Sequence, residues 1–301
     1  MVVYSAFGPG KIILLGEHGV VYGHPALAAP ISRGVRAKGF VSKKLSLEMP
    51  EGLTAPQQQV LQRAFTVAAK AVKARGLTVV LESNLPVSLG LGSSGALSVA
   101  CARVLLEATR GRAALGPEVE ALALKMEKEF HGTPSGVDHT TSARGTMVLY
   151  RKGKAQAVEA RVPVKVLVAI IEGRSPTKAT VGALRARQAK WPRRYQRYFA
   201  EMGTLAAEGA KAVRAGDLDS LGDAMNLNQG VLSAVGLSGE RIDAMVRLLR
   251  RHGALGAKLT GAGGDGGAVI GLFPEPEPVV ARLLKAGINC FASQLAGPRA
   301  L

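Results

Sequence analysis

The chain has 301 residues, and 39 Lys and Arg against 22 Asp and Glu give it a formal net charge of +17 at pH 7. Its composition, 47% hydrophobic and 20% charged, is that of a globular protein and excludes a disordered basic tail. The sequence has only two cysteines and no Cys/His cluster, which argues against a disulfide framework and a zinc site. It has no signal peptide and no apolar run long enough for a membrane segment, so we expect a cytoplasmic protein.

The hydrophobic pattern alternates between strands and helices along the chain. In the first half it predicts strands at 2–7, 12–15, 26–31, 36–40 and 77–82, and helices at 55–74, 93–108 and 117–130. In the second half it predicts strands at 147–150, 166–171, 268–272 and 288–293, a mostly helical stretch from 177 to about 252, and a helix at 277–286. This mixture predicts an α+β protein with two lobes, residues 1–163 and 164–301.

A glycine-rich segment directly precedes the helix predicted at 93–108. It reads Gly90, Leu91, Gly92, Ser93, Ser94. The first amides of a helix have no partner within the helix and attract anions, and glycines let a phosphate come close to them. The alternative is an ordinary capped helix after a tight turn. A Rossmann interpretation of the glycine spacing fails because Pro86 weakens the strand that would have to come before it.

Two acids, Glu127 and Asp138, could act together with this segment. Glu127 shares a helix face with Val119 and Ala123, and an acid on an inward-facing stripe needs a partner. Asp138 follows a Gly-Thr-Pro-Ser-Gly loop, where the alternative to a catalytic role is a helix N-cap. The joint presence of Ser94, Glu127 and Asp138 favours a site for a metal and a phosphate, because Mg²⁺ requires hard oxygen ligands.

Two further segments carry polar groups beside apolar runs. Lys11 precedes the apolar run 12–15, and Glu17 and His18 follow it. Charged groups at the ends of a short buried strand are costly without partners, although two exposed turns would explain them equally well. A second glycine-rich loop, from Gly261 to Gly267, follows Lys-Leu-Thr260 and could close over a bound phosphate or substrate; a flexible hairpin is the alternative.

Taken in this order, the segments resemble the GHMP kinase superfamily of small-molecule kinases. The Pro9-Gly10-Lys11 segment is similar to its N-terminal motif, Gly90–Ser94 to its phosphate loop, and Gly261–Gly267 to its C-terminal glycine-rich motif. Within the superfamily, the strings GEHGVVYGHPALAA (16–29) and HGTPSGVD (131–138) are most similar to the mevalonate kinase family. The resemblance implies an N-terminal lobe like ribosomal protein S5 domain 2 and a ferredoxin-like C-terminal lobe.

The resemblance also implies a role for each matching residue. Asp138 would accept the proton of the attacking hydroxyl, and Lys11 would lie beside it and steady charge on the reacting oxygen and the γ-phosphate. Ser94 and Glu127 would hold Mg²⁺, while the backbone of Gly90–Ser94 would cradle the phosphates of ATP. The substrate residues would be His18, which would orient mevalonate, together with Glu17, Thr260 and Gly261.

The resemblance therefore implies an ATP-dependent phosphotransferase that acts on mevalonate in isoprenoid biosynthesis, with a homodimer allowed as in many relatives. One alternative is a GHMP kinase for another alcohol, such as phosphomevalonate. The alternative from a different class is a basic nucleic-acid-binding protein, which no nucleic-acid-binding motif supports. We therefore expect no nucleic-acid and no membrane partner, and interpret the positive charge as a field that steers small anions.

Overall fold

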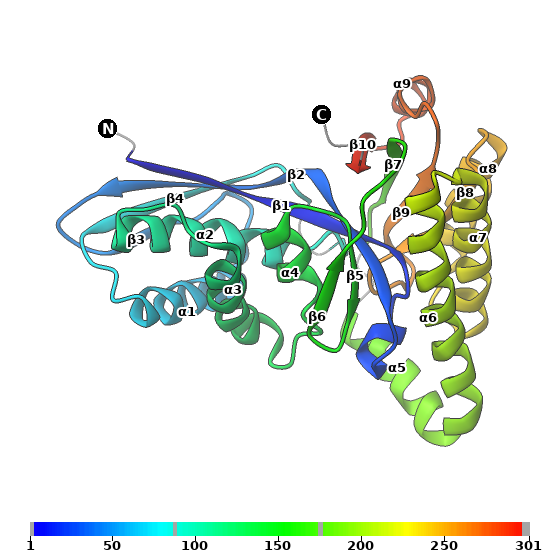
Figure 1. The fold of residues 1–301 in the computed structure, drawn as a ribbon, viewed down its shortest axis with the longest axis horizontal. Coiled ribbons are helices and arrows are strands. Elements are labelled where there is room, and N and C mark those ends of the chain that lie inside the picture. The colour runs from blue at the N-terminus through cyan, green and yellow to red at the C-terminus, as the bar shows by residue number, and fades with distance from the viewer. Residues whose placement is uncertain (1–2, 87–88, 174–176, 297–301) are drawn as a thin grey trace. The chain divides into compact units, whose positions relative to one another are not determined.

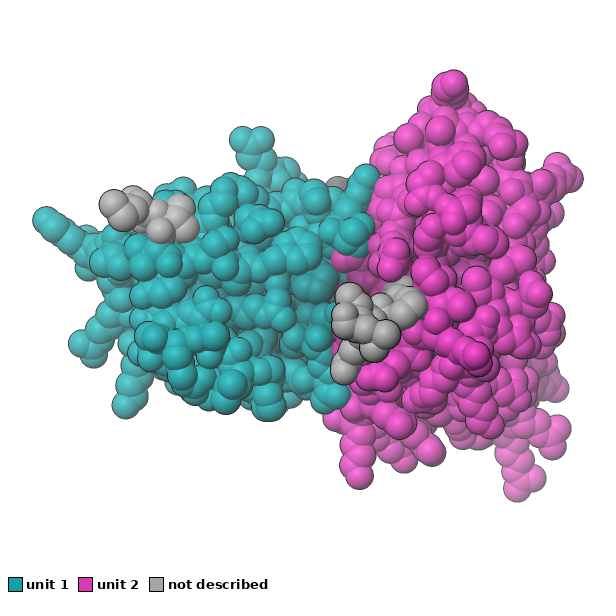
Figure 2. Space-filling model, turned by 45° about the horizontal axis from the view of Figure 1, so that its top comes forward, with its two compact units in different colours: residues 1–11, 32–87, 92–145 teal, residues 12–31, 88–91, 146–301 magenta. Residues whose placement is uncertain are grey.

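The computed structural model describes residues 3–86, 89–173 and 177–296 (Figure 1). Helices and strands alternate along the chain, and the strands form two separate sheets. The α+β class predicted from the sequence is confirmed. The chain divides into two compact units, which are coloured separately in Figure 2 and are described one at a time below.

Unit 1 consists of residues 1–11, 32–87 and 92–145. It contains the first part of β1 (Tyr4–Leu15), the second part of β2 (Ala26–Val41), β3 (Ser46–Glu48) and β4 (Leu77–Ser83). From Val35 to Val41, β2 pairs with β4 in antiparallel fashion, and β3 pairs with the other edge of β4 in parallel. Its helices are α1 (Ala55–Ala71), α2 (Ser93–Arg110), α3 (Gly116–His131) and α4 (Val137–Arg144).

The helices of unit 1 begin where the sequence supplies caps. Thr54 and Gln57 form a capping box at the start of α1. α2 and α4 instead each begin after a glycine in the left-handed region, Gly92 with φ 72° and Gly136 with φ 93°. A glycine there lets the chain turn sharply into the helix, so the first amides of both helices follow directly on a tight loop.

Unit 2 consists of residues 12–31, 88–91 and 146–301. Its main sheet has the order β10-β7-β9-β8, with all neighbours antiparallel. These strands are β7 (Val164–Ile171), β8 (Gly256–Thr260), β9 (Gly267–Leu272) and β10 (Cys290–Ala296). With helices between β7 and β8 and one helix between β9 and β10, this is the βαββαβ arrangement of a ferredoxin-like fold, as predicted.

Four helices replace the usual single connection between β7 and β8. They are α5 (Thr177–Lys190), α6 (Pro192–Ala215), α7 (Leu218–Ala234) and α8 (Glu240–Arg251), and α9 (Glu277–Lys285) follows β9. α7 and α8 lie against β8, α8 also lies against β9, and α6 packs on α7 (Figure 1). Their apolar faces and the sheet enclose one core, which includes Leu167, Phe199, Leu232, Leu249 and Leu259.

The remainder of unit 2 is built on the first half of β2. Ala26–Ala28 pair with β5 (Val148–Arg151), which pairs with β6 (Lys154–Ala157). A short 3₁₀ helix, η1 (Gly19–Tyr22), stands between β1 and β2, and Tyr22 stacks on Phe199 with ring centroids 4.0 Å apart. Among the described residues, no helix combines the length and the apolar character needed to cross a membrane.

Several local predictions were wrong. The strands predicted at 2–7 and 12–15 are one strand from Tyr4, and those predicted at 26–31 and 36–40 are also one; Val2 lies outside the described residues. The N-cap alternative for Asp138 is wrong as well, because Gly136 occupies the N-cap and Asp138 is the second residue of α4. The division into residues 1–163 and 164–301 stays a prediction.

Candidate active site

Lys11 and Asp138 form an ion pair within unit 1. Lys11 Nζ lies 3.2 Å from Asp138 Oδ1. The Lys11 side chain is 4% exposed, whereas that of Asp138 is 30% exposed. A buried ammonium needs a carboxylate partner, and the first turn of α4 adds the positive end of a helix dipole near the same carboxylate. The pair therefore presents a charged carboxylate that can still be reached from solvent.

Two glycines at the start of α2, one before the helix and one in its first turn, allow this pair to form. An ideal Cβ on Gly92 would lie 2.7 Å from Lys11 Cγ, so the side chain of Lys11 packs directly on the backbone before α2. An ideal Cβ on Gly95 would lie 2.9 Å from the carbonyl carbon of Asp138 and 3.1 Å from its Cβ. α2 and α4 consequently approach each other at their N-terminal ends, where only glycine leaves enough room.

Glu127 lies on the buried face of α3, as the sequence predicted. It is 1% exposed, and Ser98 Oγ donates to its Oε1 at 3.5 Å. Burial, and next the charge of Asp138, raise the pKa of Glu127 to about 8, against smaller opposing effects of Ser94, Ser98 and Lys11. Unit 1 thus brings Lys11, Ser94, Glu127 and Asp138 into one electrostatically coupled group.

The sequence reasoning missed two members of this group. His131 Nε2 lies 3.0 Å from Ser94 Oγ and 3.9 Å from Glu127 Oε2, and Ser98 bonds Glu127 as described above. Both could have been found from helix spacing, because Ser98 is four residues after Ser94 and His131 is four residues after Glu127. Ser93 and Ser94 are partly exposed at the first turn of α2.

In unit 2 the two glycine-rich segments meet backbone to backbone. Gly90 has φ 79° and Gly261 has φ 91°. An ideal Cβ on Gly90 would lie 3.0 Å from the carbonyl oxygen of Thr260, and one on Gly261 would lie 2.8 Å from Gly90 Cα. Side chains at either position would separate the loops, which explains why glycine stands in both; Leu91, next to them, is buried.

Thr260 ends β8 and holds β1. Its Oγ1 accepts a hydrogen bond from Ile13 N at 2.9 Å and donates to Ile13 O at 3.2 Å. Thr260 is only 2% exposed, and its hydroxyl makes both of these hydrogen bonds with the backbone of β1. The structure therefore places Thr260 as the residue that fixes the start of the Gly261–Gly267 loop.

His18 lies beside this loop in unit 2. Its Nε2 is 3.1 Å from the carbonyl oxygen of Ala262, and because a carbonyl only accepts, Nε2 must carry the hydrogen. Burial, and to a lesser extent the charge of Lys258, lower the pKa of His18 to about 4, despite an opposing contribution from Ala262. A neutral ring with a hydrogen on Nε2 leaves Nδ1 as an acceptor.

Glu17 is directed into the interior of unit 2. It forms an ion pair with Lys258, and neither side chain is more than 1% exposed. Asn228 Nδ2 also donates to Glu17 Oε2 at 3.3 Å. Its carboxylate is thus held by groups of the protein, in contrast to the accessible carboxylate of Asp138.

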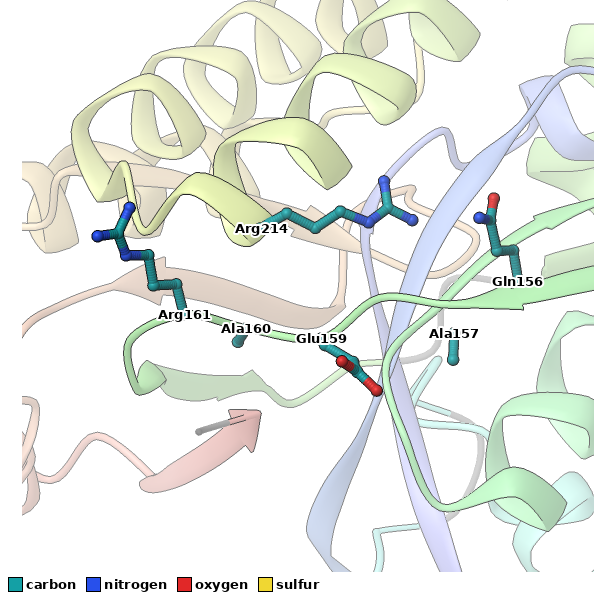
Figure 3. Close-up of a pocket in the computed structure, with 6 residues that line it drawn as sticks. All are labelled: Gln156, Ala157, Glu159, Ala160, Arg161 and Arg214. Atoms are coloured by element: carbon teal, nitrogen blue, oxygen red, sulfur yellow. The ribbon is translucent and has the colours of Figure 1, made fainter. Parts of the chain in front are cut away.

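One surface pocket of unit 2 contains none of the predicted site residues. It has a volume of about 430 Å³ and is lined by Gln156, Ala157, Glu159, Ala160, Arg161 and Arg214 (Figure 3). The side chains of Arg161 and Arg214 extend in opposite directions in this view, so their guanidinium groups do not converge on one ligand. No cluster of three or more His, Cys, Asp or Glu suited to a metal occurs in the described part of the chain.

Comparisons with known proteins identify relatives along most of the chain. The family model "GHMP kinases N terminal domain" matches residues 59–146, and "GHMP kinases C terminal" matches residues 210–289. Mevalonate kinases of Thermococcus sibiricus and Aeropyrum pernix are 34% and 36% identical, covering 93% and 90% of this chain and 92% and 89% of theirs. The crystal structure of L. major mevalonate kinase in complex with R-mevalonate superposes with a TM-score of 0.86 at 26% identity, covering 99% of this chain and 97% of that one.

Proposed function

This chain belongs to the GHMP kinase family, and we propose that it is a mevalonate kinase, which transfers the γ-phosphate of ATP to the C5 hydroxyl of mevalonate. The observation that carries the proposal is the ion pair of Lys11 and Asp138 at the start of α4. Phosphoryl transfer leaves the protein mainly to position the reactants, neutralise charge and accept one proton. A carboxylate next to a buried ammonium meets the last two of these needs.

Asp138 is the proton acceptor in this proposal. Its side chain is 30% exposed, so a substrate hydroxyl can reach the carboxylate. Lys11, with only 4% exposure, is fixed in place by burial, with its Nζ 3.2 Å from Asp138 Oδ1. The same ammonium steadies negative charge on the reacting oxygen and on the transferred phosphoryl group.

The start of α2 is proposed to hold the phosphates of ATP. The helix follows Gly92 directly, so the amides of Ser93 and Ser94 stand at its positive end without partners from a preceding turn. Gly90, in the left-handed region at φ 79°, and Leu91 lead into this turn. These contacts position the nucleotide rather than take part in bond breaking.

The oxygen donors near Glu127 fit a Mg²⁺ ion. Glu127 has a buried carboxyl group, His131 Nε2 lies 3.9 Å from its Oε2, and the raised pKa of Glu127 reflects burial and the nearby charge of Asp138. A divalent cation would offset both costs, and Ser94 Oγ and the Glu127 carboxylate are the hard ligands that Mg²⁺ prefers. A Mg²⁺ ion held there would neutralise charge on the phosphates of ATP.

His18 is proposed to orient mevalonate in unit 2. With its hydrogen on Nε2 and given to Ala262 O, the ring offers Nδ1 as an acceptor. It can therefore accept a hydrogen bond from a substrate hydroxyl but cannot donate one to the substrate carboxylate. Gly261, next to Thr260, contributes backbone to the same loop.

A coupled assay of ADP release tests the function. The wild-type protein is expected to turn over mevalonate, and not phosphomevalonate, galactose or homoserine. Asp138→Asn and Lys11→Met should each lower kcat by about 10²–10⁴-fold while circular dichroism stays unchanged. Asp219→Asn and Lys125→Met change the same residue types at exposed positions and should leave kcat unchanged. Turnover of another alcohol in place of mevalonate would contradict the proposal.

A further inference from the structure

Glu17 and Lys258 form a buried ion pair that the chemistry proposed above does not use. Their side chains are 1% and 0% exposed. Lys258 Nζ also donates to the carbonyl oxygen of Leu259 at 2.6 Å, and Asn228 Nδ2 donates to the second oxygen of Glu17 at 3.3 Å. A buried pair with this many additional hydrogen bonds has its charges compensated by the protein, so its function is not contact with a ligand.

The residues on both sides of Glu17 adopt left-handed backbone conformations. Gly16 has φ 91°, and an ideal Cβ there would lie 2.4 Å from the carbonyl oxygen of Pro25. His18 has φ 57°, which is unfavourable for a residue with a side chain. Asn228 also binds this turn, because its Oδ1 accepts from Gly16 N at 3.3 Å. Asn228 and Lys258, which hold Gly16 and Glu17, therefore also hold the strained conformation of His18.

The next residue on α7, Gln229, is linked to the glycine-rich loop through Ser238. Gln229 Oε1 accepts from Leu259 N at 2.9 Å, on the free edge of the edge strand β8. Its Nε2 donates to Ser238 Oγ at 2.8 Å, and Ser238 donates to Asp243 Oδ1 at 2.6 Å. Ser238 is bridged to Gly264, and Gly239 N donates to Gly264 O at 2.9 Å. One turn of α7 is thereby connected to both loops.

We propose that Lys258, Asn228 and Gln229 are positioning residues: Lys258 and Asn228 fix Glu17 and with it the ring of His18, and Gln229 fixes the loop from Gly261 to Gly264. This inference rests on the proposed function, in which His18 contacts mevalonate. It assigns to Glu17 a place in the support of the substrate site instead of a contact with substrate.

Asn226 provides a matched control for Asn228. It is also an asparagine on α7 with two hydrogen bonds, but both of its partners are backbone groups away from Glu17: it donates to Leu255 O and accepts from Ala257 N, each at 3.1 Å. Asn228→Ala should raise KM for mevalonate about tenfold, leave KM for ATP within about twofold and change kcat little, because a hydrogen bond to a charged group is lost near His18. Asn226→Ala should lower the melting temperature without this selective change. Equal effects of both variants on KM for mevalonate would overturn the proposal.

A second measurement does not depend on the substrate. Correlation spectra of the histidine ring nitrogens should show one tautomer of His18 in the wild type and in Asn226→Ala, and a mixture in Asn228→Ala and Lys258→Met. Compared with Lys258→Met, the variant Lys258→Arg should recover part of the single-tautomer signal. The double variant Glu17→Gln/Lys258→Met, which removes both charges, should fold but should still show the mixture of tautomers. Unchanged His18 signals in Asn228→Ala would refute the positioning role. Absence of mevalonate turnover by the wild type would instead count against the proposed function alone.

Discussion

The close approach of α2 and α4 predicts that Gly95→Ala damages catalysis more than folding. The added Cβ would lie 2.9 Å from the carbonyl carbon of Asp138, 3.0 Å from His139 N and 3.1 Å from Asp138 Cβ. Ordinary carbon contacts start near 3.5 Å, so α4 must move by about half an ångström, and it carries Asp138 with it. Because misplacement of about 1 Å can cost roughly 10²-fold in rate, we expect kcat to fall about tenfold or more.

Gly230→Ala on α7 is the matched control. An ideal Cβ on Gly230 meets no atom within 4 Å, so the substitution should only improve helix propensity, by about 1 kcal/mol. Steady-state kinetics with mevalonate and ATP and thermal unfolding would be measured for both variants. Gly95→Ala should lose kcat and gain little stability, because the steric cost offsets the same gain in propensity. If Gly95→Ala keeps the wild-type kcat, the α2–α4 contact does not set the position of Asp138.

Three further predictions concern the metal, His18 and the packing of α7. Glu127→Gln should weaken Mn²⁺ binding about tenfold or more, measured by electron paramagnetic resonance without turnover. Glu120→Gln on the same helix should not weaken it, and equal affinities of the two variants would exclude Glu127 as a ligand. Because the pKa of His18 is lowered to about 4 in the folded state, the unfolded chain takes up its proton first as the pH falls below about 6.5. Between pH 7 and 5 this proton uptake should cost at most about 2 kcal/mol of stability, measured by denaturant unfolding as the difference in pH dependence between the wild type and His18→Gln, and an identical pH dependence of both would refute the shift. Gly222→Ala would place a Cβ 2.7 Å from the backbone of Leu255 and should lower stability by about 1–3 kcal/mol, and an unchanged melting temperature would contradict this.

The long strands β1 and β2 show why glycine and proline, read as turn signals, led to wrong strand boundaries. Gly8, Pro9 and Gly10 are strong turn signals, yet β1 runs through all three. Gly8 is required because an ideal Cβ there would lie 1.9 Å from the carbonyl oxygen of Ala96, so it marks a close approach and not a turn. β2 likewise passes through Pro30, which falls between its pairing with β5 at 26–28 and with β4 at 35–41. Pro30 therefore lies outside the ladders that β2 forms with β4 and β5, where its missing amide hydrogen would be needed.

Strand β8 was missed for a different reason. Its sequence, GAKLT, is short and carries a lysine in the middle, which is typical of a loop. All five residues are buried, and Lys258 is tolerated there because Glu17, far away in the sequence, supplies the opposite charge. Only tertiary structure shows that partner. In contrast, Glu127 was predicted correctly because helix periodicity alone places it on an inward face.

The two lysine–carboxylate pairs differ in exposure, and exposure separates a chemical role from a structural one. In both pairs the ammonium is buried, at 4% for Lys11 and 0% for Lys258. The carboxylates differ: Asp138 is 30% exposed, whereas Glu17 is 1% exposed and has Asn228 on its other oxygen. A carboxylate can accept a proton from a substrate only if the substrate can reach it. Sequence spacing cannot make this distinction, because each acid comes one or two residues after a glycine, and the structure makes it through the partners that each acid finds in its own unit.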